Sequence, residues 1–240
     1  MTADEPTPVL SQNLLLSIAE QLKMPLQQIA RHAELSQLSA TPADLGAIQA
    51  TADTALSLID NYILAVKLAL EEPYGLGLAT EPVSVSAVLY DVGQQLHTHA
   101  KAYGVGLELS IDGKYGPVMA HRTALQAALT SLGYSLIEAM PAAESSQLRL
   151  QLAAHRCRYG IVAGLYSDMR QITTDALRQG RLLHGHSRQP ITAVSHTSGA
   201  GMFVADALFA AMRSQLKVSR HHNLYGLGAI FQPNHQMQLV

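Results

Sequence analysis

Two long stretches of helical periodicity at the start of the chain constrain its fold most. Apolar residues recur at helical spacing through residues 10–38, and Pro25 within this run predicts a kink because proline removes a backbone donor. The second stretch follows Thr41, a predicted N-cap residue. Its apolar residues alternate by three and four positions, which is the pattern of a coiled-coil seam: Leu45, Ile48, Ala52, Ala55, Ile59, Tyr62 and Val66. Together the two stretches predict an antiparallel helical hairpin.

A single helical hairpin cannot bury both of its faces. A second copy would complete a four-helix bundle, so we interpret residues 10–70 as a homodimerisation element. The alternative is that the hairpin packs on the rest of its own chain. Residues 1–9, which are acidic and broken by prolines, predict a disordered N-terminal segment and no targeting signal, because a signal peptide needs a basic start and an apolar stretch.

A change in composition after the second helix divides the chain. Proline and glycine enter at residues 73–82, which predicts a linker between the hairpin of residues 10–72 and a second domain of residues 83–240. Periodicity in the second domain predicts helices at residues 86–103 (capped by Ser86), 123–140, 172–179 and 201–214. It predicts strands at residues 105–111, 118–120, 147–153, 159–166, 216–219 and 224–232. This order predicts the α+β class, with an α/β sandwich of one mixed sheet and helices on one face.

The composition excludes several classes of function. Only 14% of the residues are charged, against about 25% in typical soluble domains, which predicts large buried or self-associating surfaces. A net charge of −2 argues against binding to nucleic acid. The single cysteine, Cys157, excludes an internal disulfide and a cysteine-based zinc site. No run of about 18 uncharged apolar residues is present, so we expect no membrane span and a cytoplasmic location.

Residues 19–26 read Ala-Glu-Gln-Leu-Lys-Met-Pro-Leu. They resemble the phosphoacceptor box of sensor histidine kinases, Ser-His-Glu-Leu-Arg-Thr-Pro-Leu, in a leucine, a base, the proline and the final leucine. The order of elements over residues 13–235 is also similar to the core of these kinases, which implies a dimerising hairpin followed by an ATP-binding domain of the Bergerat type. Glu20 stands where the family has its phosphorylated histidine. A carboxylate cannot serve as that imidazole, and it mimics a phosphoryl group only weakly.

Two motifs of the family, an asparagine box and a Gly-x-Gly box, align with predicted helices. In the asparagine box, Asn-Leu-Leu-x-Asn-Ala-Ile, Ser131 and Ser135 replace both asparagines, and serine is the poorer magnesium ligand. The Gly-x-Gly box keeps Gly199 and Gly201 before a predicted helix, whose free amides would suit a phosphate. The alternative is that these glycines only permit the turn and close helix packing.

The family's Asp-x-Gly-x-Gly-Ile box aligns with residues 167–172. Ser167 replaces the aspartate that would bind adenine, and Asp168 lies one position away. Met169 and Gln171 replace the two glycines, which matters because only a residue without a Cβ lets the backbone pass close to a nucleotide.

The resemblance therefore implies the family's fold without most of its chemistry. We predict a pseudokinase that is not an enzyme, has no cofactor, and acts as a dimeric binding, regulatory or scaffold module in two-component signalling. The resemblance implies a receiver domain or an authentic kinase as partner, docked on the first helix at Glu20, Lys23 and Gln27. The alternative is a histidine phosphotransferase or weak ATP-binding protein that keeps ATP and magnesium through Gly199, Gly201 and Asp168.

The many histidines suggest no metal site. His184, His186 and His196 fall where the family places a mobile lid over ATP. Four other histidines lack carboxylate or cysteine partners at ligand spacing, namely His97, His99, His221 and His222. His32, about three turns beyond Glu20 on the first helix, is a candidate for a shifted phosphoacceptor, although it lacks the Pro-Leu context.

Overall fold

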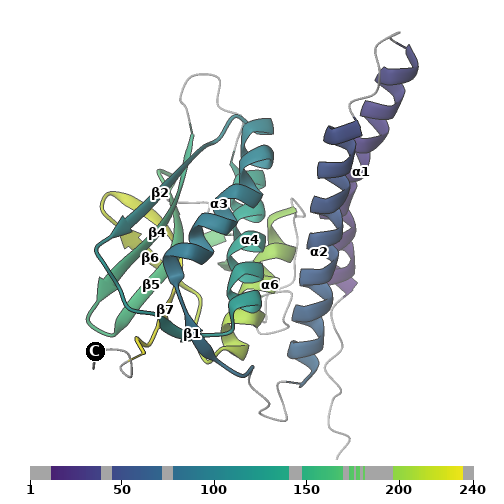
Figure 1. The fold of residues 1–240 in the computed structure, drawn as a ribbon. Coiled ribbons are helices and arrows are strands. Elements are labelled where there is room, and N and C mark those ends of the chain that lie inside the picture. Colours follow the sequence, from purple (N-terminus) through teal and green to yellow (C-terminus); the bar gives the residue numbers. More distant parts are fainter. Residues whose placement is uncertain are drawn as a thin grey trace, which may run out of the picture.

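The computed structural model describes residues 12–38, 45–71, 78–140, 148–169, 173–175, 177–178, 181 and 197–234. Its first part confirms the predicted helical hairpin. Helix α1 spans Gln12–Leu38 and contains Pro25, and α2 spans Leu45–Glu71 beside it (Figure 1). The predicted cap at Thr41, the disordered N-terminal segment and residues 73–77 of the predicted linker lie outside the described residues. Of the short helix predicted at residues 172–179, the structure describes residues 173–175, 177 and 178, and these are helical.

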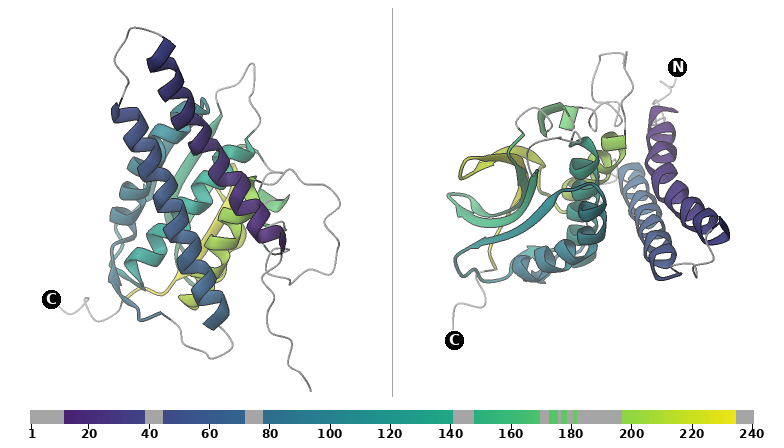
Figure 2. Two further views of the ribbon diagram at one scale, coloured as in Figure 1. Left: turned by 90° about the vertical axis from the view of Figure 1, so that its right-hand side faces the viewer. Right: turned by 90° about the horizontal axis from the view of Figure 1, so that it is seen from above.

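The second part is a mixed sheet with helices on one face, as predicted. Its five strands are, in their order across the sheet, β2 (Gly106–Asp112), β4 (Arg149–Cys157), β5 (Gly160–Ser167), β7 (Leu224–Phe231) and β6 (Lys217–His221). β2 and β4 are parallel, and the other neighbours are antiparallel. A separate two-stranded sheet pairs β1 (Glu81–Val83) with β3 (Val118–Ala120). The large sheet is strongly curled (Figure 2, right).

The elements form three layers (Figures 1 and 2). The sheet is the first layer, and α3 (Val85–Ala102), α4 (Arg122–Ala139) and α6 (Thr197–Ala211) cover one of its faces as the second. The hairpin is the third layer, and both of its helices pack on α6. Because α4 and α6 have neighbours on both sides, α4 buries every residue from Ala127 to Ile137. This middle layer explains much of the scarcity of charge, since a helix without a water-facing side has no place for charged residues.

The buried stripe of α2 differs from the predicted seam. Among the described side chains of α2, those of Ala55, Leu58, Tyr62 and Ala65 are buried, whereas Leu45 is 71% exposed. The alternative interpretation, that the hairpin packs on its own chain, holds for the contact with α6. The residues of α2 that are buried are therefore those that face α6. The hairpin still exposes large apolar side chains: Leu26, Leu35, Leu38, Leu45, Leu56 and Ile63.

Two predicted helix starts are also corrected. The cap of α3 is Ser84, whose hydroxyl accepts a hydrogen bond from the Ala87 amide at 3.4 Å, while Ser86 lies inside the first turn. α6 begins at Thr197, four residues before the predicted start, so both glycines of the Gly-x-Gly motif are helical. Within the described ranges, no helix has the length and apolar character needed to cross a membrane.

Candidate functional site

Glu20 lies on α1 beside a residue that anchors the helix. The neighbouring Gln21 is fully buried, and its side-chain carbonyl accepts a hydrogen bond from the Tyr62 hydroxyl of α2. Burial, and then the nearby Glu138, raise the pKa of Tyr62 well above its ordinary value, so the hydroxyl keeps the proton that it donates. Glu20 itself is half-buried, while Lys23 and Gln27 are exposed.

These three residues share one side of α1, because they are three and seven positions apart. The buried contact of Gln21 fixes the rotation of the helix, so Lys23 and Gln27 are held toward solvent. The structure thus brings together the predicted partner-binding residues on one side of the hairpin. His32, further along α1, is half-buried.

The serines of the aligned asparagine box lie in direct contact with α6. Ser131 and Ser135 are fully buried on α4, one turn apart, and Gly201 packs against both. A Cβ on Gly201 would lie closer than 3.0 Å to the Ser135 hydroxyl oxygen and to the Ser131 carbonyl oxygen. Asn61 of α2 donates a hydrogen bond to Ser131 Oγ at 3.2 Å, whereas Ser135 Oγ has no hydrogen-bond partner within the described part of the chain.

This contact does not fit a nucleotide phosphate. The aligned serines and glycine touch one another, so no space remains between them for a phosphate or its magnesium ion. Gly201 is the fifth residue of α6, and in an α-helix that amide bonds to the carbonyl of the first residue. The expectation of free amides before the helix is therefore wrong for Gly201, and the alternative of close helix packing is confirmed there. Gly199 is buried in the first turn of α6.

The aligned adenine box follows β5. Ser167 is buried, and its hydroxyl accepts a hydrogen bond from the Met169 amide at 3.0 Å, which closes a local turn. Asp168 is exposed, and one of its carboxylate oxygens lies 3.7 Å from Nε of Arg149 on β4. The structure therefore places Asp168 in a surface ion pair, the kind that contributes little to stability.

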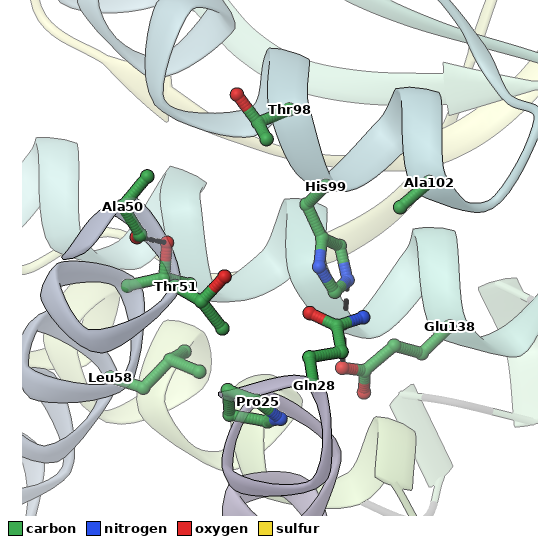
Figure 3. A pocket seen from close by; sticks show the side chains of 10 residues that line it. Pro25, Gln28, Ala50, Thr51, Leu58, Thr98, His99, Ala102 and Glu138 are labelled. Carbon is green, nitrogen blue, oxygen red and sulfur yellow. Dashed lines mark hydrogen bonds and ion pairs between the residues drawn. The ribbon is translucent and has the colours of Figure 1, made fainter. Parts of the chain in front are cut away.

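A small cavity lies between the hairpin and the helices α3 and α4 (Figure 3). Its volume is about 50 Å³, which is room for a few water molecules. The lining residues are Pro25, Gln28, Ala50, Thr51, Thr54, Leu58, Thr98, His99, Ala102 and Glu138. His99 of α3 and Glu138 of α4 meet in it, with 3.6 Å between Nε2 and Oε1. Because Pro25 belongs to the aligned phosphoacceptor box, this cavity connects that segment to the second domain.

Burial sets the protonation of this pair. It raises the pKa of Glu138 from 4.5 to about 8, and it lowers the pKa of His99 from 6.5 to about 4. At neutral pH the carboxyl is therefore protonated and the imidazole is uncharged. The rings of Tyr103 and Tyr134 each lie with their centroid 4.7 Å from that of His99 and hold it in place.

Sequence reasoning missed two groups that contain histidine. His99 has a carboxylate partner in Glu138, and His221 and His222 have one in Asp112, contrary to the expectation that these histidines lack such partners. A signal for the first group was present, because Glu138 is the only charged residue between Thr123 and Ala139. The second group joins residues that are far apart in sequence. The predicted lid histidines, His184, His186 and His196, lie outside the described residues.

Comparison with known proteins gives a structural likeness without a likeness in sequence. No model of a protein family matches the chain, and no curated protein matches it. Full-length ShkA in complex with AMPPNP matches with a TM-score of 0.54 and 14% identity, over 95% of this chain and 47% of that one. The Acinetobacter baumannii histidine kinase AdeS matches with a TM-score of 0.49 and 14% identity, over 89% of this chain and 98% of that one. A bacterial phosphotransferase matches with a TM-score of 0.47 and 13% identity, over 93% of this chain and 99% of that one.

The likeness to ShkA confirms the predicted fold. The chain has a histidine-kinase-like core, in which a helical hairpin precedes an α/β sandwich of the kinase ATPase type. The likeness concerns the fold alone, because the sequence identity is low.

Proposed function

We propose that this protein is a non-catalytic, dimeric, histidine-kinase-like module that binds a receiver domain or an authentic kinase in two-component signalling. The histidine-kinase-like fold supports a relation to two-component signalling. The single observation that carries the loss of catalysis is the contact of α4 with α6, where Gly201 packs directly on Ser131 and Ser135.

Phosphoryl transfer from ATP to histidine needs an acceptor imidazole and a metal-bound triphosphate. Glu20 supplies a carboxylate in place of the imidazole. Ser135 has a shorter side chain than asparagine, and its hydroxyl is buried against α6. Asp168 is engaged by Arg149 on the surface of the sheet. Each part of the aligned machinery is thus replaced, packed against a neighbouring helix or paired with another charge, which supports a binding role.

The exposed side of the hairpin supports the proposed binding. Leu45, Leu56 and Ile63 are exposed, and their spacings of eleven and seven positions place them on one side of α2. Contiguous exposed apolar surface marks protein–protein interfaces. On α1, Lys23 and Gln27 supply polar groups beside it. One side of the hairpin therefore packs on its own α6, and we propose that the other side pairs with a second copy or a partner protein.

A thermal-shift titration with ATP and Mg²⁺ tests the loss of nucleotide binding. We expect no saturable rise in the melting temperature up to millimolar ATP, because only a ligand that binds the native state stabilises it. A Glu20→His variant, given ATP and Mg²⁺, is expected to show no phosphohistidine, because restoring the acceptor does not restore the phosphate site.

Mg²⁺ alone is the control for an ion effect on the melting temperature. A saturable rise with ATP and Mg²⁺ would contradict the proposal and favour the alternative, an ATP-binding protein or histidine phosphotransferase. Autophosphorylation of Glu20→His would contradict the loss of the ATP site directly.

Size-exclusion chromatography with light scattering tests the proposed dimer. We expect the native chain at dimer mass and the Leu56→Glu/Ile63→Glu variant at monomer mass, because two carboxylates on the apolar side of α2 would be desolvated in the interface. Leu109→Glu, at an exposed apolar position on β2, is the matched control and should remain dimeric. A monomeric native chain, or a doubly substituted chain that stays dimeric, would show that this side of α2 is no dimer interface.

A further inference from the structure

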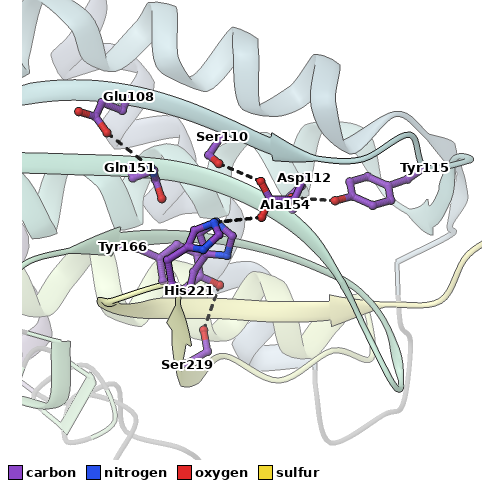
Figure 4. Close-up of polar contacts among 10 residues, drawn as sticks. Glu108, Ser110, Asp112, Tyr115, Gln151, Ala154, Tyr166, Ser219 and His221 are labelled. Atoms are coloured by element: carbon purple, nitrogen blue, oxygen red, sulfur yellow. Dashed lines mark hydrogen bonds and ion pairs between the residues drawn. The ribbon is translucent and has the colours of Figure 1, made fainter.

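Two strands at opposite edges of the sheet bring side chains into contact on the face that the helices leave open (Figure 4). In a flat sheet β2 and β6 would lie about 19 Å apart, because four interstrand spacings separate them. Here a carboxylate oxygen of Asp112, the last residue of β2, lies 3.5 Å from Nε2 of His221, the last residue of β6. The curl of the sheet therefore closes at this pair.

Tyr166 shows how the curl is built. It is fully buried on the open face, with its side chain over glycines of β5 and β7. A Cβ on Gly164, Gly226 or Gly228 would lie within 3.2 Å of the Tyr166 side chain, so the close contact requires glycine at these positions. Ser219 of β6 donates a hydrogen bond to the Tyr166 hydroxyl at 3.0 Å and holds β6 over this face.

The group at the closure has the composition and spacing of a metal site. His222 follows His221, and its Nε2 lies 3.2 Å from the same Asp112 oxygen. The three candidate ligand atoms all lie within 4.8 Å of one another. Ligands bound tetrahedrally at 2.0–2.1 Å from a zinc ion are about 3.3 Å apart, so the two nitrogen–oxygen distances already have this value within a few tenths of an ångström.

The surroundings hold these ligand atoms in position. Ser110 donates a hydrogen bond to Oδ1 of Asp112 at 3.2 Å, which leaves Oδ2 for the two histidines. The ring of His155 stacks on His221 with centroids 4.6 Å apart and 15° between the planes. Outer contacts of this kind orient the ligands of metal sites.

His221 is buried and has an unpaired ring nitrogen within the described part of the chain. It is 4% exposed, and its Nε2 has no hydrogen-bond partner within the described residues. The imidazole nitrogen lies beside a carboxylate oxygen of Asp112, and a cation between the two atoms would be bound by both.

We propose that Asp112, His221 and His222 bind one divalent transition-metal ion of the zinc class. Two imidazole nitrogens and one carboxylate oxygen are donors that zinc accepts, and solvent supplies the fourth position because His222 and Asp112 are partly exposed. The bound ion fastens β2 to β6 and keeps the sheet curled. The site is independent of the proposed partner-binding surface on the hairpin.

Calorimetric titration of the full chain with Zn²⁺ tests this site. We expect one strong site that Asp112→Asn and His222→Gln each weaken at least tenfold, while Ser110→Ala weakens it about tenfold through the orientation of Asp112. His97→Gln, which alters an exposed histidine of α3, is the matched control and should bind like the native chain. Mg²⁺ should not compete, because it prefers oxygen ligands.

Thermal unfolding gives a second readout. Zn²⁺ should raise the melting temperature of the native chain and of His97→Gln, and it should not raise that of His222→Gln, because the ion binds only where the two edges meet. The proposal is overturned if the native chain binds no Zn²⁺. It is also overturned if both Asp112→Asn and His222→Gln keep native affinity, which would assign the ion to other histidines.

Discussion

Replacing Gly201 by alanine is expected to lower the free energy of unfolding by about 3 kcal/mol, at the upper end of the usual cost of overpacking a core. The added Cβ would overlap the Ser135 hydroxyl oxygen and the Ser131 backbone carbonyl. The serine side chain can turn, but the carbonyl belongs to α4 and cannot move without the helix. Relief of the overlap therefore requires α6 to move away from α4.

Urea unfolding of the Gly201→Ala variant measures this cost, and Gly93→Ala is the matched control. Gly93 lies inside α3, where the nearest atom to an added Cβ is Leu152 Cδ2 at 4.0 Å. Alanine is expected to stabilise the protein there by about 0.5–1 kcal/mol, because it is the better helix former. The two substitutions should thus have opposite signs. A Gly201→Ala variant as stable as the native chain would show that α6 does not pack on Ser131 and Ser135 in this way.

Raising the pH from 6.5 to 8 is expected to destabilise the protein by about 2 kcal/mol through Glu138. The pKa of this carboxyl is about 8 in the folded chain and 4.5 when it is unperturbed, so over this range the folded state binds the extra proton and loses stability as the pH rises. His99 acts in the opposite direction, because its pKa is about 4 when folded and 6.5 when unperturbed. The two effects offset each other between pH 4.5 and 6.5, and that of Glu138 dominates above pH 6.5.

The measurement is urea unfolding at several pH values for the native chain and for Glu138→Gln. The variant should lose the decrease above pH 6.5 and should show a rise in stability from pH 4 to 6.5, because the effect of His99 is no longer offset. Glu34→Gln, an exposed position on α1, controls for the removal of one carboxyl and should follow the native profile. Equal losses between pH 6.5 and 8 in the native chain and in Glu138→Gln would refute the buried titration.

The sequence predicts the elements of this fold well because their signals are local. Alternating apolar residues identify the strands, and the helical spacing identifies α1 and α2. The start of α6 is missed because Gly199 and Gly201 are typical of a turn before a helix, whereas the contact with α4 selects glycine inside the helix. The buried stripe of α2 is predicted at the wrong positions because α2 has more apolar residues than fit on one side of a helix. Which of them are buried depends on the position of α6.

The site is predicted less completely, because its groups form between distant parts of the chain. Glu20, Lys23 and Gln27 share a side of α1 as their spacing requires. The pairing of His99 with Glu138 depends on the packing of α3 against α4, and that of Asp112 with His221 depends on the curl of the whole sheet. Neither the packing nor the curl leaves a periodic signal in the sequence.

The packing of the first two helices depends on a helix near the end of the chain, because α6 lies in the middle layer. α6 is the last helix that the structure describes, yet it is the surface on which the first two helices pack. During synthesis the hairpin emerges long before α6, and contacts between such distant segments form late in folding. A fragment that ends before α6 would leave the buried stripes of α2 and α4 uncovered. The boundary near residues 73–82 thus divides the chain, while the packing of α1 and α2 on α6 extends across it.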